Sequence, residues 1–185
     1  MANGLKRNIL NKEEIASKLI SNHRSFTDYI ESLSDKEFMF TRNDKWTAGQ
    51  QLEHMVRSVR PLALGLIMPS FVFGLLFGKS NRAGRTYDQL VDKYKQKLAE
   101  GGRASGQFIP PKISLAEKPE LISKLNRLAS KLAGQVSKLS EKDMDKYVLP
   151  HPLLGKLTVR EMMYFTICHV RHHEENIKAE LEKWR

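Results

Sequence analysis

Apolar residues recur along this 185-residue chain at intervals of three and four positions, the spacing that places them on one face of an α-helix. The pattern predicts four long helices and one short one: long helices at about 12–33, from 47 to Pro61, from 119 to 139 and from 158 nearly to Arg185, and a short helix at 86–100. No stretch alternates apolar and polar residues convincingly enough to predict a strand. The chain is therefore expected to form one all-α domain over residues 1–185, a four-helix bundle with a short extra helix.

Three of the long helices are preceded by a capping box, in which a polar residue and a Glu or Gln three positions later bond each other's backbone N–H groups. The pairs are Asn11 with Glu14, Thr47 with Gln50, and Thr158 with Glu161. Pro119 suits the first turn of the remaining long helix. Pro61 is expected to kink or end the second helix, because proline lacks the backbone N–H that a helix interior needs.

The segment 61–78 has the sequence PLALGLIMPSFVFGLLFG and contains no charged residue. It approaches the length of a membrane-spanning helix, but two prolines and three glycines interrupt it. We expect an apolar insertion between the second and third bundle helices that covers the bundle, lines a pocket or forms a subunit interface. Basic residues on both sides, among them Arg60 and Lys79, leave reversible contact with a membrane surface as an alternative.

Basic residues outnumber acidic ones by 31 to 21, which gives a formal net charge of +10. An excess of this size suits nucleic acid or an anionic surface. However, the lysines and arginines are spread along the chain, and helix-turn-helix spacing, paired zinc-finger cysteines and an aromatic RNA-binding motif are all missing. We therefore interpret the charge as a solvated basic surface and do not expect nucleic-acid binding.

The single cysteine, Cys168, excludes an internal disulfide and fits a reducing compartment. The first fourteen residues lack the apolar core of a secretory signal, so a cytoplasmic protein is the expectation. On a helix, Cys168 points about 100° away from its neighbour His169. We expect the thiol to serve packing, and not as a nucleophile or metal ligand.

Two histidines, His169 and His173, lie one helical turn apart within the apolar stripe of the last helix. Side chains at this spacing can place two ring nitrogens on one metal ion. His54 follows the Thr47 cap by seven residues and His169 follows the Thr158 cap by eleven, so each returns to about the direction of its cap residue. If the two helices pack side by side, His54, His169 and His173 converge.

Other polar residues near this stripe have open roles. His172 lies three residues after His169, and helical geometry alone also allows these two to share an ion. His23 falls on the apolar stripe of the first helix, where a hydrogen-bonded core histidine is favoured over a ligand. His151 is expected in a loop, and Asn176 could reach a group bound to the metal. The sequence assigns no catalytic residue.

Two stretches together resemble the DinB-like (YfiT-like) superfamily of four-helix bundles: KWTAGQQLEHM from Lys45, and HPLLGKLTVREMMYFTICHVRHHEENI from His151. The shared pattern is a Trp–Ser/Thr helix start with a histidine seven residues later, and then a G-x-L-T helix start followed by H-x-x-x-H. The resemblance implies a divalent metal, commonly nickel or zinc, held by His54, His169 and His173. Family members with known activity transfer low-molecular-weight thiols, as bacillithiol S-transferases do, or use mycothiol in isomerisation, and many others are described only as metal-dependent hydrolases.

The leading hypothesis is thus a metal-dependent thiol transferase or hydrolase that acts on a small molecule at a three-histidine site, with a homodimer as one candidate assembly. The alternative is a non-catalytic bundle that binds a partner protein or a membrane surface through the apolar segment 61–78. The family resemblance does not lead us to expect so apolar a segment between the second and third helices. This departure bears directly on the class of substrate.

Overall fold

A computed structural model describes residues 9–184 of the chain. The long helices are α1 (Lys12–Ser32), α3 (Ala48–Gly65), α6 (Lys118–Val136) and α8 (Val159–Glu182). The shorter elements are α2 (Asp35–Met39), α4 (Ser70–Leu76), α5 (Tyr87–Ala99), α7 (Glu141–Lys146), the strands β1 (Val148–His151) and β2 (Gly155–Thr158), and the 3-10 turns η1 (Gly106–Phe108) and η2 (Leu115–Glu117).

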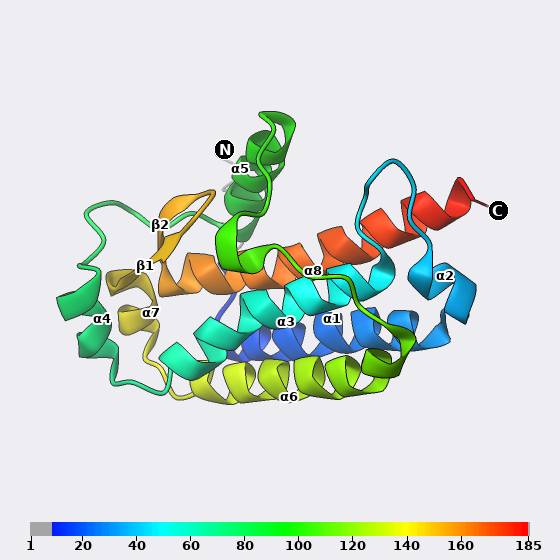
Figure 1. Ribbon diagram of the computed structural model, residues 1–185. Helices are drawn as coiled ribbons and strands as arrows, with labels where there is room; N and C mark the ends of the chain where they lie inside the picture. Colours follow the sequence, from blue (N-terminus) through cyan, green and yellow to red (C-terminus); the bar gives the residue numbers. More distant parts are fainter. Residues whose placement is uncertain (1–8, 185) are drawn as a thin grey trace, which may run out of the picture.

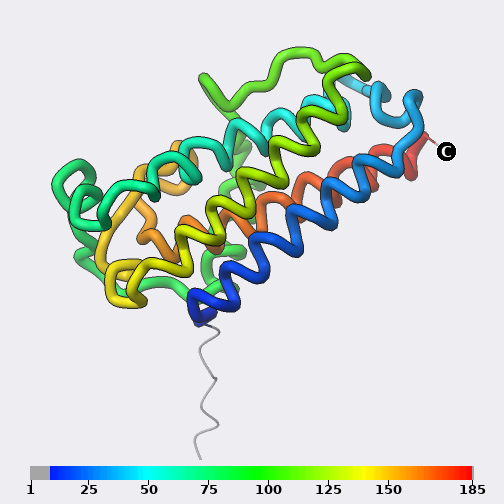
Figure 2. Tube along the Cα trace, turned by 90° about the horizontal axis from the view of Figure 1, so that it is seen from below, coloured from blue at the N-terminus to red at the C-terminus, as the bar shows by residue number. Residues whose placement is uncertain are grey.

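The four long helices form the predicted bundle. They lie side by side along one direction, with α1 against α6 and α8, and α3 against α6 and α8 (Figures 1 and 2). In Figure 1, α3 runs from right to left and α8 from left to right, so these two neighbours are antiparallel. The helix α5 packs on α8 and rises away from the bundle. The all-α fold with a short extra helix is confirmed.

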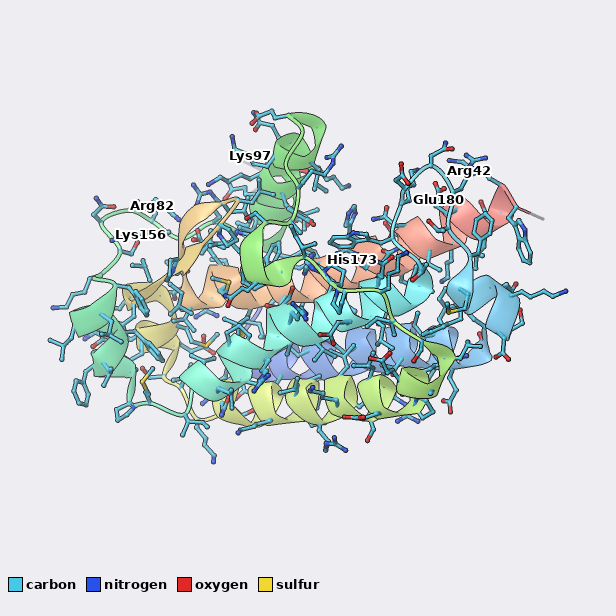
Figure 3. The ribbon with its side chains drawn as sticks, viewed as in Figure 1. Arg42, Arg82, Lys97, Lys156, His173 and Glu180 are labelled. Atoms are coloured by element: carbon cyan, nitrogen blue, oxygen red, sulfur yellow. The ribbon has the colours of Figure 1, made fainter. Side chains whose placement is uncertain are left out.

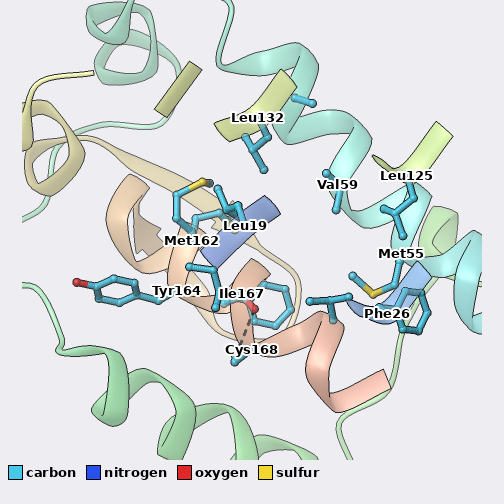
Figure 4. Close-up of a cluster of buried hydrophobic side chains, with 14 of the residues drawn as sticks. Leu19, Phe26, Met55, Val59, Leu125, Leu132, Met162, Tyr164, Ile167 and Cys168 are labelled. Atoms are coloured by element: carbon cyan, nitrogen blue, oxygen red, sulfur yellow. Dashed lines mark hydrogen bonds between the residues drawn. The ribbon is translucent and has the colours of Figure 1, made fainter. Parts of the chain in front are cut away.

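The core is built from the apolar stripes of the four long helices, which face inward and meet at the centre of the bundle (Figure 4). Its members include Leu19 and Phe26 of α1, Met55 and Val59 of α3, Leu125 and Leu132 of α6, and Met162, Tyr164 and Ile167 of α8. The first half of α8 is buried on every side, because α5, α7 and the β-hairpin cover the face that the bundle leaves open.

Cys168 belongs to this packed region. It is 8% exposed, and its thiol donates a hydrogen bond of 3.3 Å to the carbonyl of Phe165, drawn as a dashed line in Figure 4. Burial raises the pKa of the Cys168 thiol to about 12, so the sulfur is protonated at neutral pH. A protonated, buried thiol serves packing, in agreement with the prediction.

All three predicted capping boxes form. Thr47 shows the geometry: its hydroxyl accepts from the Gln50 N–H at 3.1 Å, and the Gln50 side chain accepts from the Thr47 N–H at the same distance. The corresponding pairs at Asn11 and Thr158 start α1 and α8. Because each box occupies N–H groups that lack partners within the helix, it fixes where the helix begins and hence which side chains face the core.

The prediction that Pro61 kinks or ends the second helix is wrong about the end point, since α3 continues through it to Gly65. Proline removes one helical hydrogen bond. The apolar spacing nevertheless continues past Pro61, with Ala63 and Leu66 buried in the core. In addition, the side-chain amide of Gln135 donates to the Ala63 carbonyl at 2.9 Å. Tertiary packing therefore outweighs the missing bond.

The expectation that the chain contains no strand is also wrong. Val148–His151 pairs antiparallel with Gly155–Thr158 in a two-stranded hairpin, which leads directly into α8. Each strand has only four residues, and Pro150 lies within the first, so neither shows a readable alternation. The hairpin also places His151 at the end of a strand and not in a loop.

The apolar segment 61–78 consists of the last turn of α3 and the short helix α4, at the left end of the bundle in Figure 1. Phe73 anchors α4 in the core with 1% of its surface exposed. Other apolar side chains in and before α4 are exposed: Leu64, Ile67, Met68, Phe71, Leu75 and Leu76. Within residues 9–184 no single helix is long and apolar enough to cross a membrane, and α3 and α4 pass that test only as a pair bent by 106°.

A buried carboxylate ties the segment before α5 to the start of α8. Glu161 is fully buried, and both terminal nitrogens of Arg82 donate to it at 2.7 Å. The backbone N–H groups of Arg85 and Thr158 donate to the same carboxylate at 2.8 and 2.9 Å. With all these partners in place the charge is compensated, and residues 82–85 are held against α8.

We predict that Glu161→Gln lowers the free energy of unfolding by about 2–3 kcal/mol, measured by urea denaturation. Glutamine can still complete the capping box. The loss of stability therefore measures the removal of the negative charge that Arg82 and Arg85 pair with. The control is Glu175→Gln, which removes an exposed partner of Arg171 on the same helix and should change stability by no more than about 0.5 kcal/mol. Equal effects of the two substitutions would contradict this account.

Candidate metal centre

Three histidines from two antiparallel helices converge at the middle of the bundle. The Nε2 atom of His169 on α8 lies 3.0 Å from Nε2 of His173 and 3.2 Å from Nε2 of His54 on α3. One ring nitrogen from each histidine lies within 4.8 Å of those of the other two. Figure 3 shows His173 midway along the bundle. The structure thus brings together the residues that the sequence singled out.

The outer nitrogens of two of these rings are fixed by oxygen acceptors. His54 donates from Nδ1 to the backbone carbonyl of Phe108 at 2.7 Å, and His173 donates from Nδ1 to the side-chain oxygen of Gln51 at 2.9 Å. The amide nitrogen of Gln51 donates to the Trp46 carbonyl at 3.5 Å, which turns its oxygen towards His173. Because a neutral imidazole carries one proton, Nε2 of both rings is left as an unprotonated acceptor that points into the centre.

Burial keeps the three rings neutral. It lowers the pKa of His54 below the ordinary value of 6.5, and it lowers the pKa values of His169 and His173 well below it. The neighbouring imidazoles act in the same direction, since a second positive charge nearby disfavours protonation. Neutral imidazole is the form that binds metal ions.

The geometry of the three Nε2 atoms fits one ion. His169 can direct a proton from Nε2 to only one of its two neighbours, so without an ion one of the two short nitrogen contacts lacks a hydrogen bond. Tetrahedral nitrogen ligands about 2.0–2.1 Å from a zinc ion lie roughly 3.4 Å from one another, close to the separations of 3.0 and 3.2 Å here. The cluster could therefore hold a metal ion after small adjustments of the rings.

Aromatic side chains surround the centre and restrict the rings. Trp46 lies 5.0 Å from the His54 ring and stacks on His173 with an interplanar angle of 12°. Phe165 stacks on His169 at 4.6 Å, and Tyr94 meets the same ring edge-on at 6.0 Å. These contacts limit rotation of the imidazoles, and the same three aromatic side chains line the cleft beside the centre.

The front of the site opens into a cleft of about 1120 Å³. All three histidines line it, together with residues 102–109 of the loop that follows α5. An ion held by three imidazoles would thus face a space large enough for a small-molecule ligand, with at least one coordination position free for it.

His172 and Asn176 take other roles. The His172 ring lies 5.6 Å from Tyr94 and its Nε2 atom accepts a hydrogen bond from the Asn176 amide at 3.0 Å. His172 is not a member of the three-nitrogen cluster. The amide nitrogen of Asn176 is thereby directed to His172, while Asn176 lines the cleft in front of the three histidines, and its contact with a group bound to the metal stays a prediction. Of the two registers that helical geometry allows, the structure selects His169 with His173.

Sequence reasoning missed the residues that orient the rings. Gln51 is buried three positions before His54, and a polar residue on the inner face of a helix was the available signal. The contacts of Trp46 with the His54 and His173 rings were not predicted either. Phe108 contributes a backbone carbonyl, for which the side-chain sequence holds no signal.

The fold and the site together define a four-helix bundle with three histidines on two antiparallel helices, facing a cleft. Residues 18–177 match the family model of the DinB superfamily, and this chain belongs to that superfamily. No curated protein and no solved structure matches the chain.

His23 lies outside the centre. It is fully buried in α1, and its Nδ1 donates to the Leu19 carbonyl at 2.7 Å, while Nε2 has no hydrogen-bond partner. The interpretation as a hydrogen-bonded core histidine is confirmed. Burial lowers the pKa of His23 from 6.5 to about 4, because the protonated ring would have to charge without water around it.

This burial predicts an acid-dependent loss of stability. As the pH falls from 6.5 towards 4, the unfolded chain binds a proton at His23 and the folded chain does not, so the free energy of unfolding decreases by up to about 3 kcal/mol. In His23→Leu that part of the decrease should disappear, whereas the other histidines contribute equally to both proteins and cancel in the difference. Urea denaturation from pH 7.5 to 4 measures it, and parallel pH curves for the two proteins would refute the assignment.

Proposed function

We propose that this protein is a metal-dependent enzyme that transfers a low-molecular-weight thiol to a small molecule, or hydrolyses one, at a centre formed by His54, His169 and His173. The observation that supports the proposal is the inward orientation of the three Nε2 atoms at the wall of an open cleft. A structural site would instead be closed, usually by four ligands that include cysteine, and the thiol of Cys168 is directed to the Phe165 carbonyl.

Nickel and zinc are the proposed metals, because imidazole ligands suit both ions. A divalent ion on three neutral imidazoles retains its charge, and it lowers the pKa of a bound water towards about 7 or stabilises a thiolate. The chain's own contribution is to orient the rings through Gln51 and Phe108 and to restrict their rotation with Trp46 and Phe165.

Thiol transfer is favoured over hydrolysis because the cleft offers few carboxylates that could deprotonate a water, and its other candidate bases are the imidazoles of His151 and His172. Among the described residues that line the cleft, the carboxylates are Asp44 and Glu180, and Glu180 is paired with Lys45 at 2.6 Å. A thiol has an ordinary pKa of about 8.5 and ionises more readily than water, so it needs less help from a neighbouring base. The sulfur would attack the electrophilic carbon of the second substrate, and the leaving group would depart with the bonding electron pair.

The test is a screen of the nickel- and zinc-loaded protein with cysteine and other small thiols, using a chromogenic aryl halide as acceptor and an aryl ester to detect hydrolysis. We expect thiol-dependent turnover that disappears on chelation and in His173→Ala. The His172→Ala variant should retain it, because His172 lies outside the cluster. Turnover that survives chelation and the His173→Ala substitution would refute the proposal.

We propose as a second candidate function that the exposed face of the segment 61–78 binds a partner, either a second copy of this chain or a membrane surface. The observation that favours it is the exposure of neighbouring apolar side chains: 60% for Ile67, 58% for Phe71 and 80% for Leu75. Phe73 and Phe77 are not part of this face, since Phe73 is buried and Phe77 lines the cleft.

We predict that Phe71→Ser with Leu75→Ser abolishes such binding without loss of stability, because both side chains are already in contact with solvent. Sedimentation velocity over a concentration series tests self-association, and flotation with vesicles containing anionic lipid tests membrane contact. A wild-type protein that stays monomeric and does not float with vesicles would exclude both partners.

A further inference from the structure

The cleft in front of the three histidines has two unlike ends. Towards the end of α8, the wall carries the charged residues Lys45, Glu180 and Lys183, and Glu180 pairs with both lysines. Figure 3 shows Glu180 beside Arg42 at that end of the molecule, well separated from His173. The histidines lie between this charged end and the remainder of the cleft.

The other end of the cleft is apolar. Three elements form its wall: α3 beyond His54, α8 before His169, and α4, which covers the end. From α3 come Val59 and Leu62, with Leu66 directly after its end. From α4 comes Phe73, with Phe77 directly after its end, and from α8 come Met162 and Phe165. We call this part of the cleft the apolar arm.

The apolar arm is long. His54 and Leu66 are separated by twelve residues of helix, which corresponds to about 18 Å along the axis of α3. Because α8 runs antiparallel to α3, its apolar residues Phe165 and Met162 continue in the same direction from His169 (Figure 1). The whole cleft, at about 1120 Å³, exceeds the roughly 300–1,000 Å³ that pockets for drug-sized ligands occupy.

Few polar side chains lie in the arm, and the Thr166 hydroxyl and the Nδ1 atom of His151 already have partners within the protein. The hydroxyl of Thr166 donates to the Met162 carbonyl at 2.9 Å. His151 accepts hydrogen bonds from the backbone N–H groups of Leu153 and Leu154 at 3.1 and 3.0 Å. A polar ligand would therefore gain few hydrogen bonds in the arm, chiefly from the Nε2–H of His151, whereas an apolar ligand would gain from the burial of its surface.

We infer that the substrate of this site is an amphiphile, whose reacting polar group lies at the histidine centre and whose long apolar chain lies in the apolar arm. The inference rests on the proposed function for the position of the reacting group, and it adds the chemical class of the substrate. Met68 and Ile109 line the cleft and are 37% and 51% exposed, so the mouth of the arm is itself apolar and admits such a chain.

Straight-chain carboxylates serve as probes of the arm. We expect the affinity for hexanoate, octanoate and decanoate to rise about fourfold for each added methylene, the gain from burying that group in an apolar wall. Isothermal titration calorimetry on chelated and on zinc-loaded protein measures this slope independently of catalysis. Equal affinities along the series would overturn the inference.

Two leucines on α3 provide a matched pair of variants. Leu62 lines the arm, whereas Leu64 is 47% exposed and lies outside it. Leu62→Gln should reduce the gain in affinity per methylene, and Leu64→Gln should leave it unchanged. Met68→Gln is a second variant of the arm, at a side chain that is already partly exposed. If Leu64→Gln reduces the gain in affinity as much as Leu62→Gln does, the carboxylates bind unspecifically at the exposed face, and the inference is overturned.

Metal content measured in the same samples separates the two proposals. If the protein binds zinc but its affinity for the carboxylates does not depend on their chain length, the amphiphilic substrate is refuted and the metal centre stands. A chain-length dependence in protein that binds no metal would refute the proposed function, while the apolar arm would stand as a ligand site.

Discussion

The hydrogen bonds on the outer nitrogens of His54 and His173 are the constraint on which the centre depends. Each Nδ1 donates to an oxygen that can only accept, and so each Nε2 is an unprotonated acceptor directed inward. Three buried, neutral imidazoles with their Nε2 atoms turned towards one another leave a short contact without a hydrogen bond, and an ion held between them would remove it. The position of Gln51 on α3 and of the loop carbonyl at Phe108 therefore bears on metal binding as directly as the three histidines do.

The rest of the fold holds these groups in place. The antiparallel contact of α3 with α8 sets His54 opposite His169, and the capping boxes at Thr47 and Thr158 fix the start of both helices. Glu161 binds the segment before α5 to α8, and the loop after α5 brings Phe108 back to His54. A segment remote in sequence thus completes the site, and the same loop forms one wall of the cleft.

Much of this arrangement could be predicted from the sequence because helical periodicity is a strong signal. The stripes of the four long helices and the capping pairs gave the bundle, and the distances of His54 and His169 from their caps indicated a shared face. The hairpin at Val148–His151 was missed because four residues with a proline show no alternation, and the continuation of α3 past Pro61 was missed because tertiary packing compensates for a lost backbone bond. Helical geometry alone permits both His172 and His173, whereas the apolar stripe and the family resemblance favoured His173, which the structure places in the cluster.

The most direct test of the metal centre is a metal titration of protein purified without a histidine tag, with content determined by elemental analysis. We expect about one equivalent of nickel or zinc in the wild type and in His172→Ala, and little in His54→Ala, His169→Ala or His173→Ala. A site emptied by His172→Ala and retained by His173→Ala, or a wild type that binds no divalent ion after reconstitution, would contradict the account.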